Sequence, residues 1–260
     1  MKKKIAPITK KLYWALFNLR HEKTFISHGY LVHYLYQQGK SNALIVVFSA
    51  FAPDLYPTYN YVRTLWGKTG CNLLFIKDDF IHLRSGGSYY LGKNGDLHGI
   101  DAVCELIHMI RKRSGSTRVV GIGSSKGGTA ALLFGAKLHF DILILGACQY
   151  FIGSYLQEHK PECLAILTGS PAPSAEEIVN LDNIVRHAVI EGTNGKKPLI
   201  HLHYSDQEHT YAEHIAPMLQ DLDACGYTVV KDVGNYTRHT DVSIHYLPYL
   251  QQILHKTLQE

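Results

Sequence analysis

The chain has 260 residues, of which 46% are hydrophobic and 18% are charged, the balance of a folded protein rather than a disordered one. Its formal net charge of +4 is too small, and its basic residues too scattered, to indicate a nucleic-acid-binding protein. No apolar run approaches the length of a membrane span. Five cysteines, an odd number without a C-x-x-C pair, indicate free thiols in a reducing cytoplasm.

The first 22 residues predict a basic N-terminal helix. Lys2, Lys3 and Lys4 precede an apolar stretch at residues 12–17 that is too short and too interrupted for a signal peptide. We expect this helix to pack on the domain, with a membrane surface or an assembly partner as the alternative contact.

Farther along, apolar strands alternate with helices of period 3.6. Strands are expected at residues 30–36, 43–49, 72–77, 118–122, 141–145, 199–204 and 227–233, and helices at 59–66, 100–113, 128–137, 212–225 and 242–258. The first strand is a candidate antiparallel edge strand. This order predicts one α/β domain over residues 1–260, with a mostly parallel sheet covered by helices on both faces. The weaker pattern at residues 149–197 is where such a fold commonly carries a lid or cap.

The segment Arg118–Ala131 has the order strand, sharp turn, helix around a G-x-S-x-G motif. This context predicts the nucleophile elbow of an α/β-hydrolase fold, in which the central serine stands exposed above the sheet. The motif's register selects Ser125 as the nucleophile, with Ser124 as the rival. Glycines allow the strand and the helix to approach closely. The elbow glycines are Gly123, Gly127 and Gly128.

A serine nucleophile needs a base and an orienting acid, which follow it in this fold in the order acid, histidine. Asp206 lies just past the strand 199–204 and is the predicted acid; Glu208 is the alternative, and Asp206 could instead cap the next helix. His239 lies in the loop after the last strand and is the predicted base. His245 lies farther on, within the final helix, and is expected to be a packing residue.

The oxyanion of an acyl-transfer intermediate needs two N–H donors. One is expected from Lys126, the residue after the nucleophile, and the other from Ala50 or Phe51 in the loop after the strand 43–49. No metal site and no cofactor are expected. His201 and His203 alternate along one strand without further ligands, and His209 with Glu213 is an isolated pair.

Two motifs together carry a family resemblance. The stretch Asp78-Asp79-Phe80, followed by Gly87-Ser88-Tyr89-Tyr90-Leu91-Gly92, combines with the Gly-Ser-Ser-Lys-Gly-Gly elbow. From about Ala43 to the C-terminus the chain resembles α/β-hydrolase-fold proteins of bacterial capsular polysaccharide biosynthesis. It is more distantly similar to the accessory Sec system protein that acetylates glycans on serine-rich adhesins. The resemblance implies Ser125 as nucleophile, Asp206 as acid and His239 as base, with a glycan-linked acyl substrate handled in the cytoplasm before export.

The chain is therefore expected to be a serine esterase or O-acyltransferase acting on a carbohydrate or a surface-polysaccharide precursor. Hydrolysis and transfer share one acyl-enzyme, so the sequence does not separate them. The alternatives are a general hydrolase of small esters or peptides, and a non-catalytic hydrolase-fold scaffold in a polysaccharide assembly complex. The presence of a candidate Ser, Asp and His in the expected order disfavours the scaffold.

Overall fold

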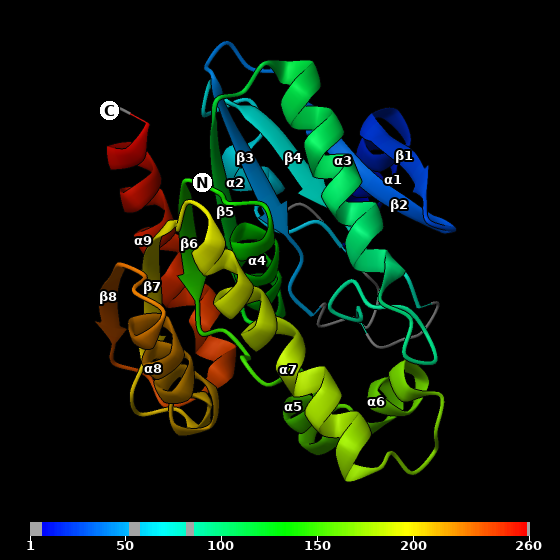
Figure 1. Cartoon of the computed structure of the whole chain (residues 1–260). Coiled ribbons are helices and arrows are strands. Elements are labelled where there is room, and N and C mark those ends of the chain that lie inside the picture. Colours follow the sequence, from blue (N-terminus) through cyan, green and yellow to red (C-terminus); the bar gives the residue numbers. More distant parts are fainter. Residues whose placement is uncertain (1–6, 52–57, 82–85, 259–260) are drawn as a thin grey trace.

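The structure is a computed structural model that describes residues 7–51, 58–81 and 86–258, so Lys2, Lys3 and Lys4 of the expected basic helix lie outside the described residues. Its centre is an eight-stranded sheet in the order β1-β2-β4-β3-β5-β6-β7-β8 (Figure 1). The strands are β1 (Glu22–Ser27), β2 (Tyr30–Gln37), β3 (Ala43–Phe48), β4 (Asn72–Ile76), β5 (Arg118–Ser124), β6 (Ile142–Gly146), β7 (Leu199–Ser205) and β8 (Val229–Gly234).

The sheet is mostly parallel, as expected. Only β2 pairs antiparallel, with β1 on one side and β4 on the other, and the pairs from β4 through β8 are all parallel. The strand predicted at 30–36 is β2 and is antiparallel, but it is not the edge. A turn at His28 and Gly29, both with positive φ, folds β1 back outside it. The sequence does not predict β1, because its residues are mostly polar and contain no apolar run.

Helices cover both faces of the sheet (Figure 1). They are α1 (Pro7–His21), α2 (Val62–Leu65), α3 (His98–Ser114), α4 (Lys126–Lys137), α5 (Ile152–His159), α6 (Pro161–Thr168), α7 (Ala175–Glu191), α8 (Ala216–Ala224) and α9 (Val242–Thr257). Apolar residues of α3, α4, α5, α7 and α8 share one core with the sheet, and those of α1, α2 and α9 share the other. The helix expected at 59–66 forms only the single turn of α2.

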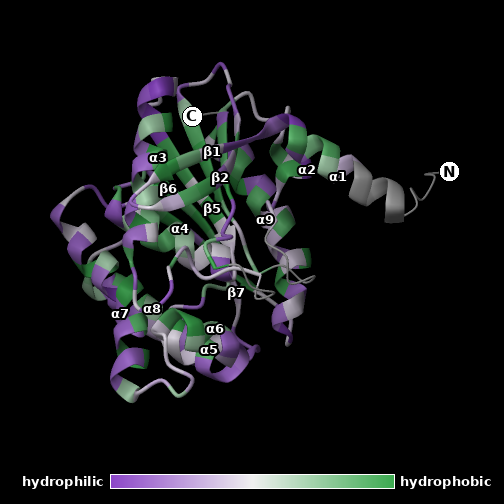
Figure 2. Cartoon of the chain, turned by 90° about the vertical axis from the view of Figure 1, so that its right-hand side faces the viewer, coloured by the Kyte–Doolittle hydropathy of each residue, from purple (hydrophilic) through white to green (hydrophobic). Residues whose placement is uncertain are grey.

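The central strands are apolar because both of their faces are covered. Every residue of β3, β4 and β6 is buried, whereas β1 and β8 at the two edges contain only half-buried and exposed positions. Figure 2 shows the same gradient, with hydrophobic residues gathered on the inner strands and α4 and hydrophilic residues on the outer helices. Among the described residues, none of the helices has the length and apolar character needed to cross a bilayer.

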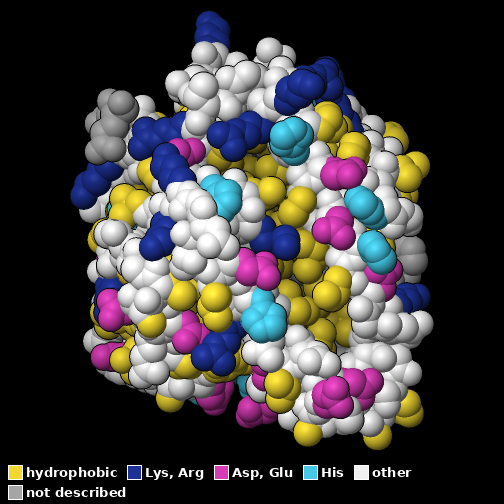
Figure 3. Space-filling model, viewed as in Figure 1, with side chains coloured by type: hydrophobic (Ala, Val, Ile, Leu, Met, Phe, Trp, Pro, Cys, Tyr) yellow, Lys and Arg dark blue, Asp and Glu magenta, His cyan; other side chains and the backbone are white. Residues whose placement is uncertain are grey.

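The segment predicted as a lid contains α5, α6 and α7. The long helix α7 packs against α4 and α5, so it belongs to the helical layer on the sheet. The carbonyls of Ile166 and Leu167 in α6 accept hydrogen bonds from the backbone N–H groups of Asn94 and Gly95, which ties α6 to the loop before α3. A hollow between α3 and α7 lies on the face shown in Figure 3 and is lined in part by Ile100, Leu133 and Ile184. A lid function for this segment stays a prediction.

Candidate active site

The elbow serine lies between β5 and α4 in a strained backbone conformation. Ser125 has φ 53° and ψ −129°, a region that side chains other than glycine's rarely adopt, at a cost of about 1–3 kcal/mol. A Cβ at Gly123 would lie 2.1 Å from the carbonyl oxygen of Gly127, and a Cβ at Gly127 would lie 2.7 Å from that of Phe48. A Cβ at Gly128 would lie 2.9 Å from the Cys148 sulfur. The three elbow glycines are therefore needed where the strand, the helix and the end of β3 meet.

The predicted base lies against the predicted nucleophile. His239 begins a short 3-10 turn (His239–Asp241) after β8, and its Nε2 lies 2.8 Å from Ser125 Oγ. His245 is exposed and stacks on the ring of Tyr236 with the centroids 4.8 Å apart, so it does not compete for this place. The hydroxyl of the rival Ser124 is 2.6 Å from that of Tyr61 instead.

The acid in contact with His239 is Glu208 and not Asp206. Both Glu208 carboxylate oxygens lie near His239 Nδ1, at 3.2 and 3.3 Å, and the Glu208 side chain is fully buried. Asp206 is exposed in the turn directly after β7. The prediction of Asp206 as the triad acid is therefore corrected to Glu208, which the sequence had offered as the alternative. The chain must continue two residues beyond Asp206 before a carboxylate reaches His239 Nδ1.

The environment of Glu208 keeps its carboxylate ionised. Burial by itself would raise the pKa of Glu208, but hydrogen bonds from His239 and from the Thr210 hydroxyl outweigh burial and lower that pKa below its usual value. A buried carboxylate that stays charged can hold the imidazole in one tautomer and stabilise the imidazolium when it forms.

One of the two alternatives for the second oxyanion donor is already engaged. The backbone N–H of Ala50 donates to Asn60 Oδ1 at 2.9 Å. Among the described residues the N–H of Phe51 makes no hydrogen bond, and the N–H of Lys126, at the first position of α4, has no acceptor within the helix. For the second oxyanion donor, the geometry therefore favours Phe51 over Ala50, and the N–H of Lys126 remains available as the first donor.

A glutamine that the sequence analysis did not single out also contacts the nucleophile. Gln149 follows β6, is fully buried, and donates from Nε2 to Ser125 Oγ at 2.8 Å. The Tyr89 hydroxyl donates to Gln149 Oε1 at 2.6 Å, which sets the orientation of the amide. Thr129 Oγ1 bonds both the N–H and the carbonyl of Gln149. No local motif marks this residue, because it reaches Ser125 across two neighbouring strands.

The Gly-Ser-Tyr-Tyr-Leu-Gly loop is hydrogen-bonded to residues next to the candidate oxyanion loop and to the buried partner of Lys126. The Tyr90 hydroxyl accepts the N–H of Ser49 at 2.9 Å, next to the predicted oxyanion loop. Asp78 pairs with Lys126 Nζ at 2.6 Å, with both side chains fully buried, and accepts the Ser88 N–H at 2.7 Å. Burial lowers the pKa of Lys126, and the Asp78 carboxylate opposes that shift.

The histidines considered as metal ligands take different places. His203 Nδ1 lies 2.5 Å from Asp232 Oδ2, so this histidine is hydrogen-bonded to the carboxylate of the edge strand β8. His209 and Glu213 do form the expected pair, at 3.1 Å, but the structure adds His159 beside them.

No family model matches the chain, and no curated protein matches it. Solved structures do. The capsule O-acetyltransferase of Neisseria meningitidis serogroup A is 22% identical with a TM-score of 0.72, over 89% of this chain and 94% of that one. A mutant of that enzyme in complex with CoA matches equally well, at 21% identity and a TM-score of 0.72 over 90% of this chain and 94% of that one.

Two further structures extend the likeness. The glycosylation-associated protein complex of Streptococcus agalactiae is 16% identical with a TM-score of 0.78, over 92% of this chain and 47% of that one. A fluorophosphonate-binding serine hydrolase of Staphylococcus aureus is 10% identical with a TM-score of 0.63, over 92% of this chain and 96% of that one. With the sheet order and the elbow, these likenesses show that the chain has the α/β-hydrolase fold.

Proposed function

We propose that the protein is a serine O-acyltransferase that modifies a hydroxyl of a carbohydrate in a surface polysaccharide or its precursor. The observation that carries the proposal is the line of contacts from Ser125 Oγ through both ring nitrogens of His239 to the buried Glu208. A hydroxyl, an imidazole and a carboxylate in this order can deprotonate the serine and stabilise the resulting imidazolium. A scaffold protein has no need of that arrangement.

In the first half-reaction, Ser125 Oγ attacks the acyl carbonyl while its proton passes to His239 Nε2. Glu208 holds Nδ1–H, so that Nε2 is free to accept the proton. The N–H groups of Lys126 and Phe51 would bind the oxyanion. When the tetrahedral intermediate collapses, the leaving group departs with the proton from His239, and the acyl group stays as an ester on Ser125.

In the second half-reaction, His239 takes the proton of a sugar hydroxyl, whose oxygen attacks the ester carbonyl. The new ester leaves, and His239 returns the proton to Ser125 Oγ. The meningococcal capsule O-acetyltransferase, of which a mutant is in complex with CoA, supports a coenzyme A thioester as the donor and a capsule-type sugar as the acceptor.

Simple hydrolysis is the second candidate, because it uses the same acyl-enzyme with water as the acceptor. Two observations favour it: the His239 side chain remains 21% exposed, so water has access to the base, and a serine hydrolase is among the similar structures.

The test compares acyl transfer from acetyl-CoA to an O-deacetylated capsular polysaccharide with hydrolysis of acetyl-CoA alone. We expect Ser125→Ala and His239→Ala to abolish both activities and fluorophosphonate labelling, and Ser124→Ala to keep the labelling. Acetate appearing on the sugar supports transfer, and free acetate that is unaffected by the sugar supports hydrolysis. Full labelling of Ser125→Ala would reject the assignment of the nucleophile.

A further inference from the structure

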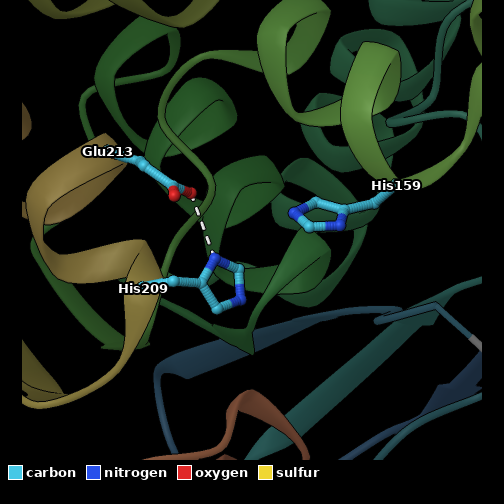
Figure 4. A group of neighbouring side chains, drawn as sticks. All are labelled: His159, His209 and Glu213. Atoms are coloured by element: carbon cyan, nitrogen blue, oxygen red, sulfur yellow. Dashed lines mark hydrogen bonds and ion pairs between the residues drawn. The ribbon is translucent and has the colours of Figure 1, made fainter.

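Three metal-ligating side chains meet beside the candidate active site. His159 is the last residue of α5, His209 lies in the helical residues just after the turn that follows β7, and Glu213 lies in the single π-helical turn Tyr211–Ile215. One potential ligand atom from each lies within 4.8 Å of the others. In Figure 4 the His159 ring approaches the His209–Glu213 pair from the opposite side. Two elements about fifty residues apart in sequence thus present imidazole nitrogens and a carboxylate to one point.

The donor set fits a zinc-like cation. Imidazole nitrogen and carboxylate oxygen are usual ligands of Zn²⁺, and three protein ligands leave one coordination position open. His209 and Glu213 are one helical turn apart, with Nδ1 and Oε2 3.1 Å from each other. Ligand atoms about 2.0–2.1 Å from a tetrahedral ion lie roughly 3.3 Å apart, so this pair already has nearly the required spacing. All three side chains are exposed and can close around an ion without breaking a packed core.

The group lies next to the catalytic residues but shares none of them. The ring centroid of His209 is 5.2 Å from that of His159 and 6.1 Å from that of His239. His209 also directly follows Glu208 in the chain. A cation held here would tie the C-terminal end of α5 to the turn that carries the triad acid.

We propose that His159, His209 and Glu213 bind one Zn²⁺ ion that clamps α5 to the turn after β7 at the edge of the candidate active site. The fourth coordination position faces solvent and takes water. The clamp follows from the donor geometry and does not depend on acyl transfer being the protein's function.

The test titrates Zn²⁺ into the purified full-length protein against a chromophoric chelator. We expect one equivalent to bind, and His159→Ala, His209→Ala and Glu213→Ala each to weaken binding by at least about 10- to 100-fold, the loss that removing a mere hydrogen-bond partner of a metal ligand already causes. His108→Ala, which removes an exposed histidine of α3, is the matched control and keeps full affinity. Mg²⁺ should not compete, since it prefers oxygen ligands.

Two further readouts do not depend on activity. Co²⁺ in place of Zn²⁺ should give visible d–d absorption in the wild type that each ligand variant loses. Zn²⁺ at a concentration that just saturates the wild type should raise the Tm of the wild type more than that of each ligand variant, because a weaker site in the folded state stabilises it less. Absence of saturable binding at micromolar protein concentration would overturn the proposal. So would equal binding by the wild type and all three ligand variants, or an equal loss in His108→Ala.

Discussion

Ser125 Oγ is the point where two hydrogen bonds of opposite direction meet. His239 Nε2 lies 2.8 Å away and can accept the hydroxyl proton, while Gln149 Nε2 donates to the same oxygen from 2.8 Å. The donor holds a lone pair of the oxygen and directs the proton toward the imidazole. It would also stabilise negative charge on that oxygen as the proton leaves.

Glu208→Gln should separate the two candidate acids. The amide can favour the wrong imidazole tautomer, and loss of the equivalent charge in a serine triad can lower kcat on the order of 10⁴-fold. Asp206→Asn is the matched control: Asp206 is exposed, and Glu208 is the carboxylate on His239, so kcat should stay close to that of the wild type and the free energy of unfolding within about 0.5 kcal/mol. Steady-state kinetics on acetyl-CoA or a chromogenic acetate ester, with Tm as a folding check, measures both. A large loss of kcat in Asp206→Asn with little loss in Glu208→Gln would reverse the assignment.

Gln149→Leu should lower kcat with little change in KM. A hydrogen bond to a group that becomes charged contributes about 1.5–3 kcal/mol, which corresponds to a loss of roughly 10- to 150-fold. Tyr89→Phe should act in the same direction but less, because it frees the amide to turn its oxygen toward Ser125. Tyr150→Phe, which removes a hydroxyl bonded to Asp221, is the control and should leave kcat unchanged. An unchanged kcat in Gln149→Leu would show that the hydrogen bond from Gln149 to Ser125 does not contribute to kcat.

At the scale of elements, the loop around residues 86–92 and the start of α4 are joined by a buried ion pair. Asp78 accepts from Lys126 Nζ and from both the N–H and the hydroxyl of Ser88. The Lys126 ammonium also lies over the rings of Tyr90 and Phe51, at 5.1 and 5.5 Å from their centroids. The pair thus connects the loop that supports the site to the helix that begins directly after Ser125.

Lys126→Met should destabilise the fold by about 3–5 kcal/mol, because it leaves the Asp78 carboxylate buried without a counter-charge. Adding Asp78→Asn removes that charge and keeps an acceptor for Ser88, so the double variant should recover much of the loss. Equilibrium unfolding in urea measures both free energies. A double variant no more stable than Lys126→Met would mean that the lost lysine contacts, and not the unpaired charge, cause the defect.

At the scale of the whole molecule, α1 lies at the border of the domain, beside α2 (Figure 2). One side of the helix is anchored. The Phe17 ring packs edge-on against Trp66 with centroids 5.2 Å apart, and the Arg63 guanidinium lies over the Trp14 ring. The other side exposes Leu16 by 57% and Leu19 by 84%. The expectation that this helix packs on the domain is therefore compatible with a second contact on its outer side.

This outer side is where the membrane contact, proposed from the sequence beside an assembly partner as the alternative for this helix, would be made. Replacing Leu16 and Leu19 together by serine should reduce co-sedimentation with vesicles containing phosphatidylglycerol, because it removes apolar surface that would enter the interface. The fold should be unaffected, since both side chains are exposed. Ile244→Ser, at a 68% exposed position on α9, is the control and should bind vesicles like the wild type. Vesicle binding that is equal in all three proteins, or absent in the wild type, would refute the proposal.

The sequence by itself determined the features that depend on local patterns. The alternation of strands and helices predicts a mostly parallel sheet. The glycines around Ser125 indicate the elbow, because a Cβ at these positions would not fit between the strand and the helix. The order nucleophile, acid, histidine along the chain also predicted His239, since the loop after the last strand lies beside the elbow in this topology.

Only the tertiary structure decided which side chains meet. Asp206 and Glu208 are two residues apart after the same strand, and the direction of each side chain in the turn selects Glu208. Gln149 and His159 carry no local signal, because each is brought to its partners by elements far away in sequence. The β1 strand was missed for a related reason: its polar residues form a strand only because β2 offers a free edge with which to pair.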